Sequence, residues 1–317
     1  MAKAIPLSRP VARKTRTHEA WRQIKRHWRL YPVISLPLVW LGIFRYAPMY
    51  GVQIAFRDFI AVEGITGSPW VGLKYFERFF GSHQFGRLLG NTIGINLYSL
   101  AVGFPIPIIL AIALNEVRNQ FFKKTGQMVT YAPHFISTVV LVGILFQVLD
   151  PRIGLLTKLL SLVGIEALNV IAKPEWFKTL YVLSGIWQNA GYSSIIYIAA
   201  LSSIDPQLEE AAIIDGASRL QKIWYIDLPG ILPTAVILLI LNTGQIMNVG
   251  FEKIYLMQNS LNMSRSDVIS TYVYRIGLVR AQYSFAAAVG LFNSVVNLIL
   301  LITINQIARR LGETSLW

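Results

Sequence analysis

Long apolar runs, separated by polar or charged segments, set the pattern of this chain of 317 residues. Apolar runs of about 18 or more residues are typical of membrane-spanning helices. The pattern predicts an all-α integral membrane protein with six transmembrane helices, and six spans place both ends of the chain on one side of the membrane. The predicted spans cover residues 32–49, 88–114, 128–149, 180–201, 228–249 and 285–307.

Prolines modify two of these spans. Pro105 and Pro107 lie deep in the second run, and Pro133 lies near the start of the third. Proline removes a backbone donor and clashes with the preceding turn, so we expect the second span to be broken or kinked at its proline pair. Between the spans, residues 70–80 and 267–279 predict short helices at the outer interface, suited to receiving a partner or shaping a vestibule.

The charge distribution predicts the orientation. The first thirty residues hold nine Lys or Arg against one acid, Glu19, and Trp21, Ile24 and Trp28 recur there at helical spacing, which predicts a helix lying on the membrane surface. We therefore expect a basic arm at residues 1–30 and a transmembrane domain at residues 31–317. With both termini inside, the inner segments carry sixteen Lys or Arg in about 77 positions, against twelve in about 104 outside. Basic residues accumulate on the cytoplasmic side, so the amino terminus is predicted to be cytoplasmic.

The composition serves mainly to exclude other classes of protein and other kinds of site. With 54% hydrophobic and 14% charged residues, the net charge of +13 fits cytoplasmic flanks that face anionic lipid better than a nucleic-acid surface. The chain has no cysteine, and its four histidines are far apart and lack metal-ligand spacing. It also lacks the Gly-x-Ser-x-Gly nucleophile elbow and the Gly-rich phosphate-binding loop. We expect no catalytic residue, no metal and no cofactor bound by this chain.

The most distinctive segment is the charged loop at residues 205–228, between the fourth and fifth spans. Asp205 followed by Pro206 is typical of a helix start, because the carboxylate caps the first turn and proline presets its backbone. The sequence predicts one short helix up to Gly216 and a second one that leads into Pro229. Two readings stay open on the residues alone. The first helix either docks on another protein through its alanine face, or it packs on its own bundle.

A resemblance favours docking. Glu210-Ala211-Ala212, three residues, Gly216, nine residues, then Ile226-Asp227-Leu228-Pro229 is similar to the signature loop of permease subunits in bacterial binding-protein-dependent ABC importers. The likeness covers nearly the whole chain from about residue 30, as at Ala132-Pro133-His134 and Leu316-Trp317. It extends to the subgroup that imports polysaccharides and complex oligosaccharides. Within that subgroup the chain resembles permeases of alginate importers, which would imply an acidic substrate.

The resemblance implies a type I importer fold, in which this chain and a second permease form a heterodimeric pore in the bacterial inner membrane. Two ATP-binding cassette subunits would each receive one coupling helix and would use ATP and Mg, while a periplasmic solute-binding protein delivers the saccharide. Glu210 would anchor the loop on the ATPase, and Gly216 would permit the turn. The residues expected to couple the ATPase are Glu209, Glu210, Ala211, Ala212, Asp215, Gly216 and Ala217.

Polar side chains within the apolar runs predict a substrate pathway. Such groups are costly inside a membrane unless they are paired or face water, and sugars are bound by amides together with aromatic faces. The candidate pathway residues are Trp187, Asn189, Tyr192, Asn242, Gln245 and Asn293. Alternatively, these amides bridge helices inside the bundle.

Two further classes of protein fit the sequence less well. An ion-coupled secondary transporter of a small solute would need intramembrane acids or an inverted repeat with broken helices, and neither is visible in the sequence. A membrane-bound glycan enzyme would need a carboxylate pair or a metal site, which the sequence also lacks.

Overall fold

The computed structural model describes residues 25–162 and 169–310, and the chain divides into two units, Met1–Gln53 and Ile54–Trp317. Helix α2 (Leu30–Leu41), in the first unit, continues through a π-helical turn, Gly42–Tyr46, into the 3-10 helix Ala47–Phe56, which ends in the second unit. This stretch contains the predicted first span, 32–49, and is long and apolar enough to cross a membrane. Most of the predicted surface helix at residues 21–29 lies outside the described residues.

Within the described part of the chain, four helices could cross a membrane by length and composition, or five if one bent pair forms a single span. The four are Leu30–Phe56, His83–Asn115, Arg219–Thr243 and Tyr283–Arg310. The predicted fourth span lies inside α10 (Pro174–Leu201), which is 28 residues long but is not among these four. Polar residues such as Gln188, Asn189 and Ser193 lower its hydropathy. The predicted all-helical class agrees with the described residues, where the only β-pairing is the isolated bridge Arg57–Trp70.

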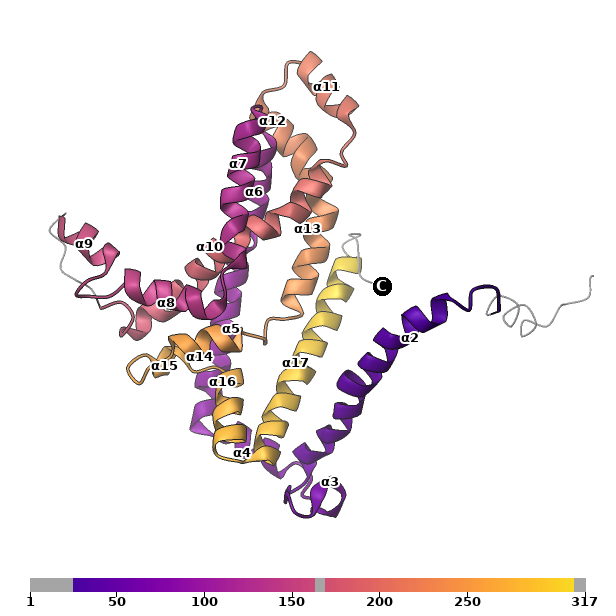
Figure 1. Ribbon diagram of the computed structural model, residues 1–317, viewed down its shortest axis with the longest axis vertical. Helices are drawn as coiled ribbons and strands as arrows, with labels where there is room; N and C mark the ends of the chain where they lie inside the picture. Colours follow the sequence, from indigo (N-terminus) through magenta and orange to yellow (C-terminus); the bar gives the residue numbers. More distant parts are fainter. Residues whose placement is uncertain (1–24, 163–168, 311–317) are drawn as a thin grey trace, which may run out of the picture. The chain divides into compact units, whose positions relative to one another are not determined.

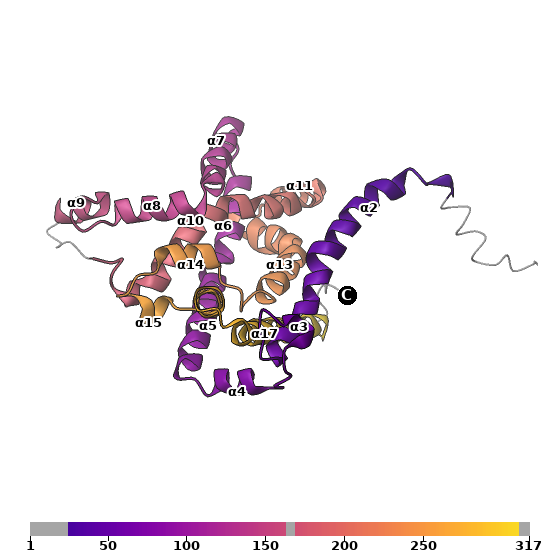
Figure 2. The same ribbon diagram turned by 60° about the horizontal axis from the view of Figure 1, so that its bottom comes forward.

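The predicted third span, 128–149, is not one continuous helix. The chain forms α7 (Gln120–Tyr131), a 3-10 turn at Ala132–Phe135 and α8 (Thr138–Val148), and the two halves are bent by 100°. Ile136 is extended, and the Ser137 hydroxyl accepts a hydrogen bond from the amide of Val140, which caps a new helix. Figure 2 shows α7 and α8 leaving their junction in different directions.

The proline pair acts as predicted in the second span. Helix α5 (His83–Gly103) ends one residue before Phe104, and α6 (Pro105–Asn115) begins at the first proline. The ring of Pro105 occupies the first helical position, where a missing backbone donor costs nothing. One 33-residue span therefore consists of two helices.

Three apolar cores hold the second unit together. Helices α5, α16 and α17 (Tyr283–Arg310) pack around Phe79, Leu88 and Phe285, and helices α6, α10 and α13 pack around Ile231. The third core includes Ile95, Val142, Phe177 and Ile254. Figure 1 shows α17 running beside α13, and α11 and α12 at the opposite end of this unit from α4.

Short helices occupy the connections. The predicted helices at residues 70–80 and 267–279 correspond to α4 and to α16 with its π-helical extension Arg275–Val279. The predicted fifth span, 228–249, ends earlier than expected, at Thr243. The remaining helices are α3 (Gly64–Gly67), α4 (Lys74–Phe80), α9 (Leu155–Leu162), α11 (Pro206–Ile214), α12 (Arg219–Lys222), α13 (Leu228–Thr243), α14 (Phe251–Met257), α15 (Met263–Ser266) and α16 (Ile269–Tyr274).

Candidate functional site

The charged loop contains the short helix that the sequence predicts. Helix α11 begins at Pro206, and the carboxylate of Asp205 accepts a hydrogen bond of 3.0 Å from the amide of Gln207. Asp215 follows the helix, and Gly216 then adopts a φ of +77°, in the left-handed region that favours glycine. The predicted helix start and the predicted glycine turn are both confirmed.

Helix α11 has no buried residue. Leu208, Ile213 and Ile214 are 54%, 69% and 84% exposed, so the helix presents apolar side chains to its surroundings. Glu210 and Ala211 are exposed, and Ala212 and Ala217 are half-buried. An exposed apolar surface rimmed with charge is typical of a protein contact, which makes packing on its own bundle the weaker of the two readings.

An ion-pair cluster connects this loop to the rest of the chain. The ammonium of Lys222, in α12, lies 2.5 Å from a carboxylate oxygen of Glu116 and 3.5 Å from one of Glu209. Glu116 directly follows α6, whereas Glu209 belongs to α11. Lys222 therefore links the exposed helix to the end of the second span.

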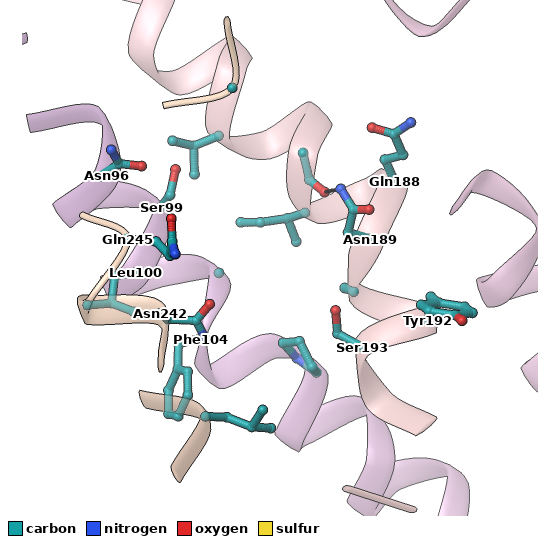
Figure 3. A pocket seen from close by; sticks show the side chains of 18 of the residues that line it. Asn96, Ser99, Leu100, Phe104, Gln188, Asn189, Tyr192, Ser193, Asn242 and Gln245 are labelled. Carbon is teal, nitrogen blue, oxygen red and sulfur yellow. Dashed lines mark hydrogen bonds between the residues drawn. The ribbon is translucent and has the colours of Figure 1, made fainter. Parts of the chain in front are cut away.

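A cavity of about 770 Å³ lies between α5, α6, α10 and α13. Four of the six predicted pathway residues line it: Asn189, Tyr192, Asn242 and Gln245. Figure 3 shows Asn96, Ser99, Asn242 and Gln245 on one side, facing Asn189 and Ser193 on α10. The structure thus gathers side chains from runs that are far apart in the sequence.

Hydrogen bonds order part of this lining. The Asn189 amide donates to the carbonyl of Gly185 at 3.0 Å, and its oxygen lies 3.0 Å from Nδ1 of His134. The His134 ring stacks on Tyr192 with a centroid distance of 3.9 Å. Asn96 donates to the carbonyl of Ile246 at 2.6 Å, as a helix-bridging amide would. Some of these polar residues therefore bridge helices and also line the cavity.

Two predicted pathway residues lie elsewhere. Trp187 borders a separate apolar groove with Leu141 and Leu180, and its side chain is 52% exposed. Asn293 lines a groove between α16 and α17, and its amide donates to Asn248, which does border the cavity, at 3.1 Å.

One charged residue of the cavity was not predicted from the sequence. Lys253, in α14, borders the cavity although its segment was assigned to an outer loop. No local pattern marks it, because the path of the chain after Thr243 depends on tertiary packing, here in the core that Ile254 shares with Ile95, Val142 and Phe177.

A polar cluster fixes the segment before α4, in a connection that the sequence predicts to be an outer loop. The Tyr75 hydroxyl donates to Asp58 at 2.6 Å, and Lys74 lies 3.3 Å from the same carboxylate. Hydrogen bonds from Tyr75 and then Lys74 lower the pKa of Asp58, whereas burial and the hydrogen bond to Asp58 raise the pKa of Tyr75 to about 12. The amide of Phe59 also donates to Ser284, in α17, at 2.8 Å. These contacts attach the segment to α17.

With this geometry established, residues 103–313 match the family described as binding-protein-dependent transport system inner membrane component. The chain belongs to this family. The match includes α6, most of the residues that line the cavity and the whole charged loop, so these features belong to one transport architecture. Membership confirms the predicted class, an integral inner-membrane component of a transport system and not a catalytic enzyme, and sets aside the ion-coupled transporter.

Relatives resemble the chain along nearly its whole length. It is 44% identical to the polygalacturonan/rhamnogalacturonan transport system permease protein YteP of Bacillus subtilis (strain 168), covering 91% of this chain and 90% of that protein. It is 41% identical to Protein LplB of the same organism, covering 93% and 92%. Among solved structures, it is similar to a chain of a bacterial ABC transporter involved in the import of the acidic polysaccharide alginate. That match has a TM-score of 0.85 and 42% identity, and it covers 92% of this chain and 99% of the other.

Proposed function

We propose that the chain is the transmembrane subunit of an ATP-driven importer that passes an oligosaccharide or polysaccharide from a periplasmic binding protein to the cytoplasm by alternating access. The cavity between α5, α6, α10 and α13 supports this function, because its amides and aromatic rings suit a sugar. The near full-length likeness to a polysaccharide permease and to a chain of an alginate importer supports the same substrate class.

The energy would come from partner chains. Two ATP-binding cassette subunits, which bind ATP and Mg, would each receive one coupling helix, here α11, with Glu210 at the contact and Ala211 and Ala212 in a groove of the partner. The exposed apolar residues of α11 support this contact. The amino terminus and the charged loop would then lie in the cytoplasm.

A second permease would complete the pore as a heterodimer. The solute-binding protein would dock on the outer side, where α4 and α16 lie at the end of this unit opposite α11. A related alginate transporter has been solved in complex with an alginate pentasaccharide-bound periplasmic protein, which supports such a partner for this chain.

The test uses the complete importer in proteoliposomes. Glu210→Ala removes the anchoring carboxylate, and Gly216→Pro forbids the φ of +77° at the turn, because proline fixes φ near about −65°. Both variants should insert and assemble, yet lose sugar-stimulated ATP hydrolysis and uptake. Glu63→Ala, at an exposed glutamate of the outer loop, serves as the matched control. Unchanged uptake in both loop variants would contradict the coupling role, and ATP hydrolysis by the purified chain alone would contradict the assignment of the ATPase to partners.

A further inference from the structure

A single buried lysine borders the cavity. Lys253 is 8% exposed, and its ammonium donates to the carbonyl of Tyr181 at 2.9 Å. The same ammonium lies 4.7 Å from the centroid of the Tyr181 ring, in a cation–π contact. A Cβ added at Gly185 would lie 3.3 Å from it, so the glycine leaves room for the lysine head on the face of α10.

Lys253 lacks a carboxylate partner. None of the ion pairs within the described residues includes it, and no Asp or Glu lines the cavity. Burying a charge away from water is costly unless an opposite charge compensates it. The buried carboxylate of Asp267 has such compensation, with Arg275 at 2.7 Å and Arg87 at 3.9 Å. A carbonyl and an aromatic face satisfy Lys253 only in part, so it retains capacity for an anion.

The other polar groups of the lining are uncharged. Amides and hydroxyls dominate, among them Asn96, Gln188, Asn242 and Gln245, and the rings of Tyr181 and Tyr192 add aromatic surface. Amides and rings suit hydroxyl groups and the apolar faces of sugar rings, whereas one ammonium suits one carboxylate. A phosphate or sulfate polymer would favour several cations at one point, and among the described residues Lys253 is the only cation in this lining.

We propose that Lys253 is a specificity-determining residue that pairs with the carboxylate of a uronic-acid unit as an acidic saccharide passes through the cavity. This inference rests on the proposed saccharide import and refines it to a substrate class. The pairing replaces the water that a carboxylate loses on entering the cavity, whereas a neutral sugar needs no such group. The importer therefore discriminates between acidic and neutral chains in the permease itself.

The experiment compares Lys253→Gln with Lys253→Arg in the complete importer. Lys253→Gln keeps a hydrogen-bond donor but removes the charge, and Lys253→Arg keeps the charge. The probes are oligogalacturonate and oligomannuronate, each tested beside its carboxyl-reduced, uncharged counterpart. Uptake is measured with the loaded binding protein, and binding to the permease–ATPase assembly is measured directly, so that selection by the binding protein is separated from selection by the cavity. Lys124→Gln, at an exposed lysine of α7 outside the cavity, is the matched control.

We expect Lys253→Gln to lower binding and uptake of the acidic probe about tenfold to a hundredfold, as loss of a hydrogen bond to a charged group does. Binding and uptake of the carboxyl-reduced probe should change less than about twofold, because this probe has no charge to pair with Lys253. Lys253→Arg should restore binding and uptake of the acidic probe. Equal losses for both probes would make Lys253 a structural residue and overturn the inference. Undiminished transport of the acidic probe would overturn it too, and in both cases saccharide import itself would stand. A wild-type importer that binds and transports none of the probes would overturn the inference and the proposed function together.

Discussion

Replacing Lys222 by methionine tests how the exposed helix α11 is attached to the transmembrane helices. Lys222 joins Glu209 of α11 to Glu116 at the end of α6. Asp227 lies one turn further along, is 1% exposed, and within the described residues forms no hydrogen bond through its carboxylate oxygens. Lys222→Met leaves three carboxylates near one another without their cation.

The two ion pairs differ in strength. The Lys222 and Glu116 side chains are 16% and 21% exposed and lie 2.5 Å apart, so this pair is partly shielded from water. A hydrogen bond between charged groups contributes about 1.5–3 kcal/mol, and partial exposure favours the lower end of that range. Glu209 is 38% exposed and lies 3.5 Å away, so its pair contributes below about 1 kcal/mol. We therefore expect Lys222→Met to cost about 2 kcal/mol, mostly through Glu116.

The assay is a double-mutant cycle of Lys222→Met and Glu116→Gln in the complete importer. Denaturant unfolding in detergent should give a coupling energy of about 1–2 kcal/mol between the two positions. In proteoliposomes, Lys222→Met should lower the sugar imported per ATP hydrolysed, because α11 moves with less constraint from α6. Lys123→Met is the matched control, since its ammonium lies 3.5 Å from the amide oxygen of Asn115 and forms no ion pair within the described residues.

Two results would refute this reasoning. A coupling energy below about 0.3 kcal/mol would mean that the ion pair is solvated and contributes little. Uptake per ATP equal to that of the Lys123→Met control would mean that α11 transmits its motion through other contacts, such as α12 and α13.

Two further predictions concern packing and pH. A Cβ at Gly191 would clash with the carbonyl oxygen of Thr130, so Gly191→Ala should destabilise the chain by about 1–3 kcal/mol in detergent unfolding. Gly90→Ala should be neutral or slightly stabilising, because the described residues leave open space around a Cβ at this position. Folding holds the pKa of Tyr75 at about 12 against an ordinary 10.0, so the stability it contributes is complete below pH 10 and is lost as the pH rises toward 12. Tyr75→Phe should therefore lower the unfolding temperature at neutral pH, because the hydrogen bond to Asp58 is lost. Above pH 10, the unfolding temperature of the variant should fall less steeply with pH than that of the wild type. Equally steep falls in both proteins would contradict the raised pKa of Tyr75.

Local signals in the sequence were sufficient where the structure depends on neighbouring residues. Asp205 and Pro206 predicted the start of α11, Gly216 predicted its end, and Pro105 predicted the break between α5 and α6. Each effect acts within about one helical turn, through a capping bond or a missing backbone donor. The 100° bend between α7 and α8 was missed, because the apolar run continues across it while the backbone turns at Ile136.

The cavity was only partly predictable. Amides within apolar runs predicted Asn189, Asn242 and Gln245 as pathway residues, because burial of a polar group has to be compensated, and all three line the cavity. The same argument could not distinguish these residues from Asn293, which lines a different groove. A polar residue in an apolar run is expected to avoid lipid, but its position in the run does not show which neighbouring helices it faces. Lys253 gave no signal, because its segment is short and mixed in polarity.

The sequence by itself determined the class of the protein, its apolar helices and the short helix of the charged loop, since hydropathy and helix signals are local properties. Only the tertiary structure decided which side chains meet. Lys222 reaches Glu116 from more than a hundred positions along the chain, and Lys253 approaches Tyr181 from about seventy. Such pairs depend on how helices cross, and helix crossing is set by the summed packing of many side chains, as where Gly191 lets α10 approach α7.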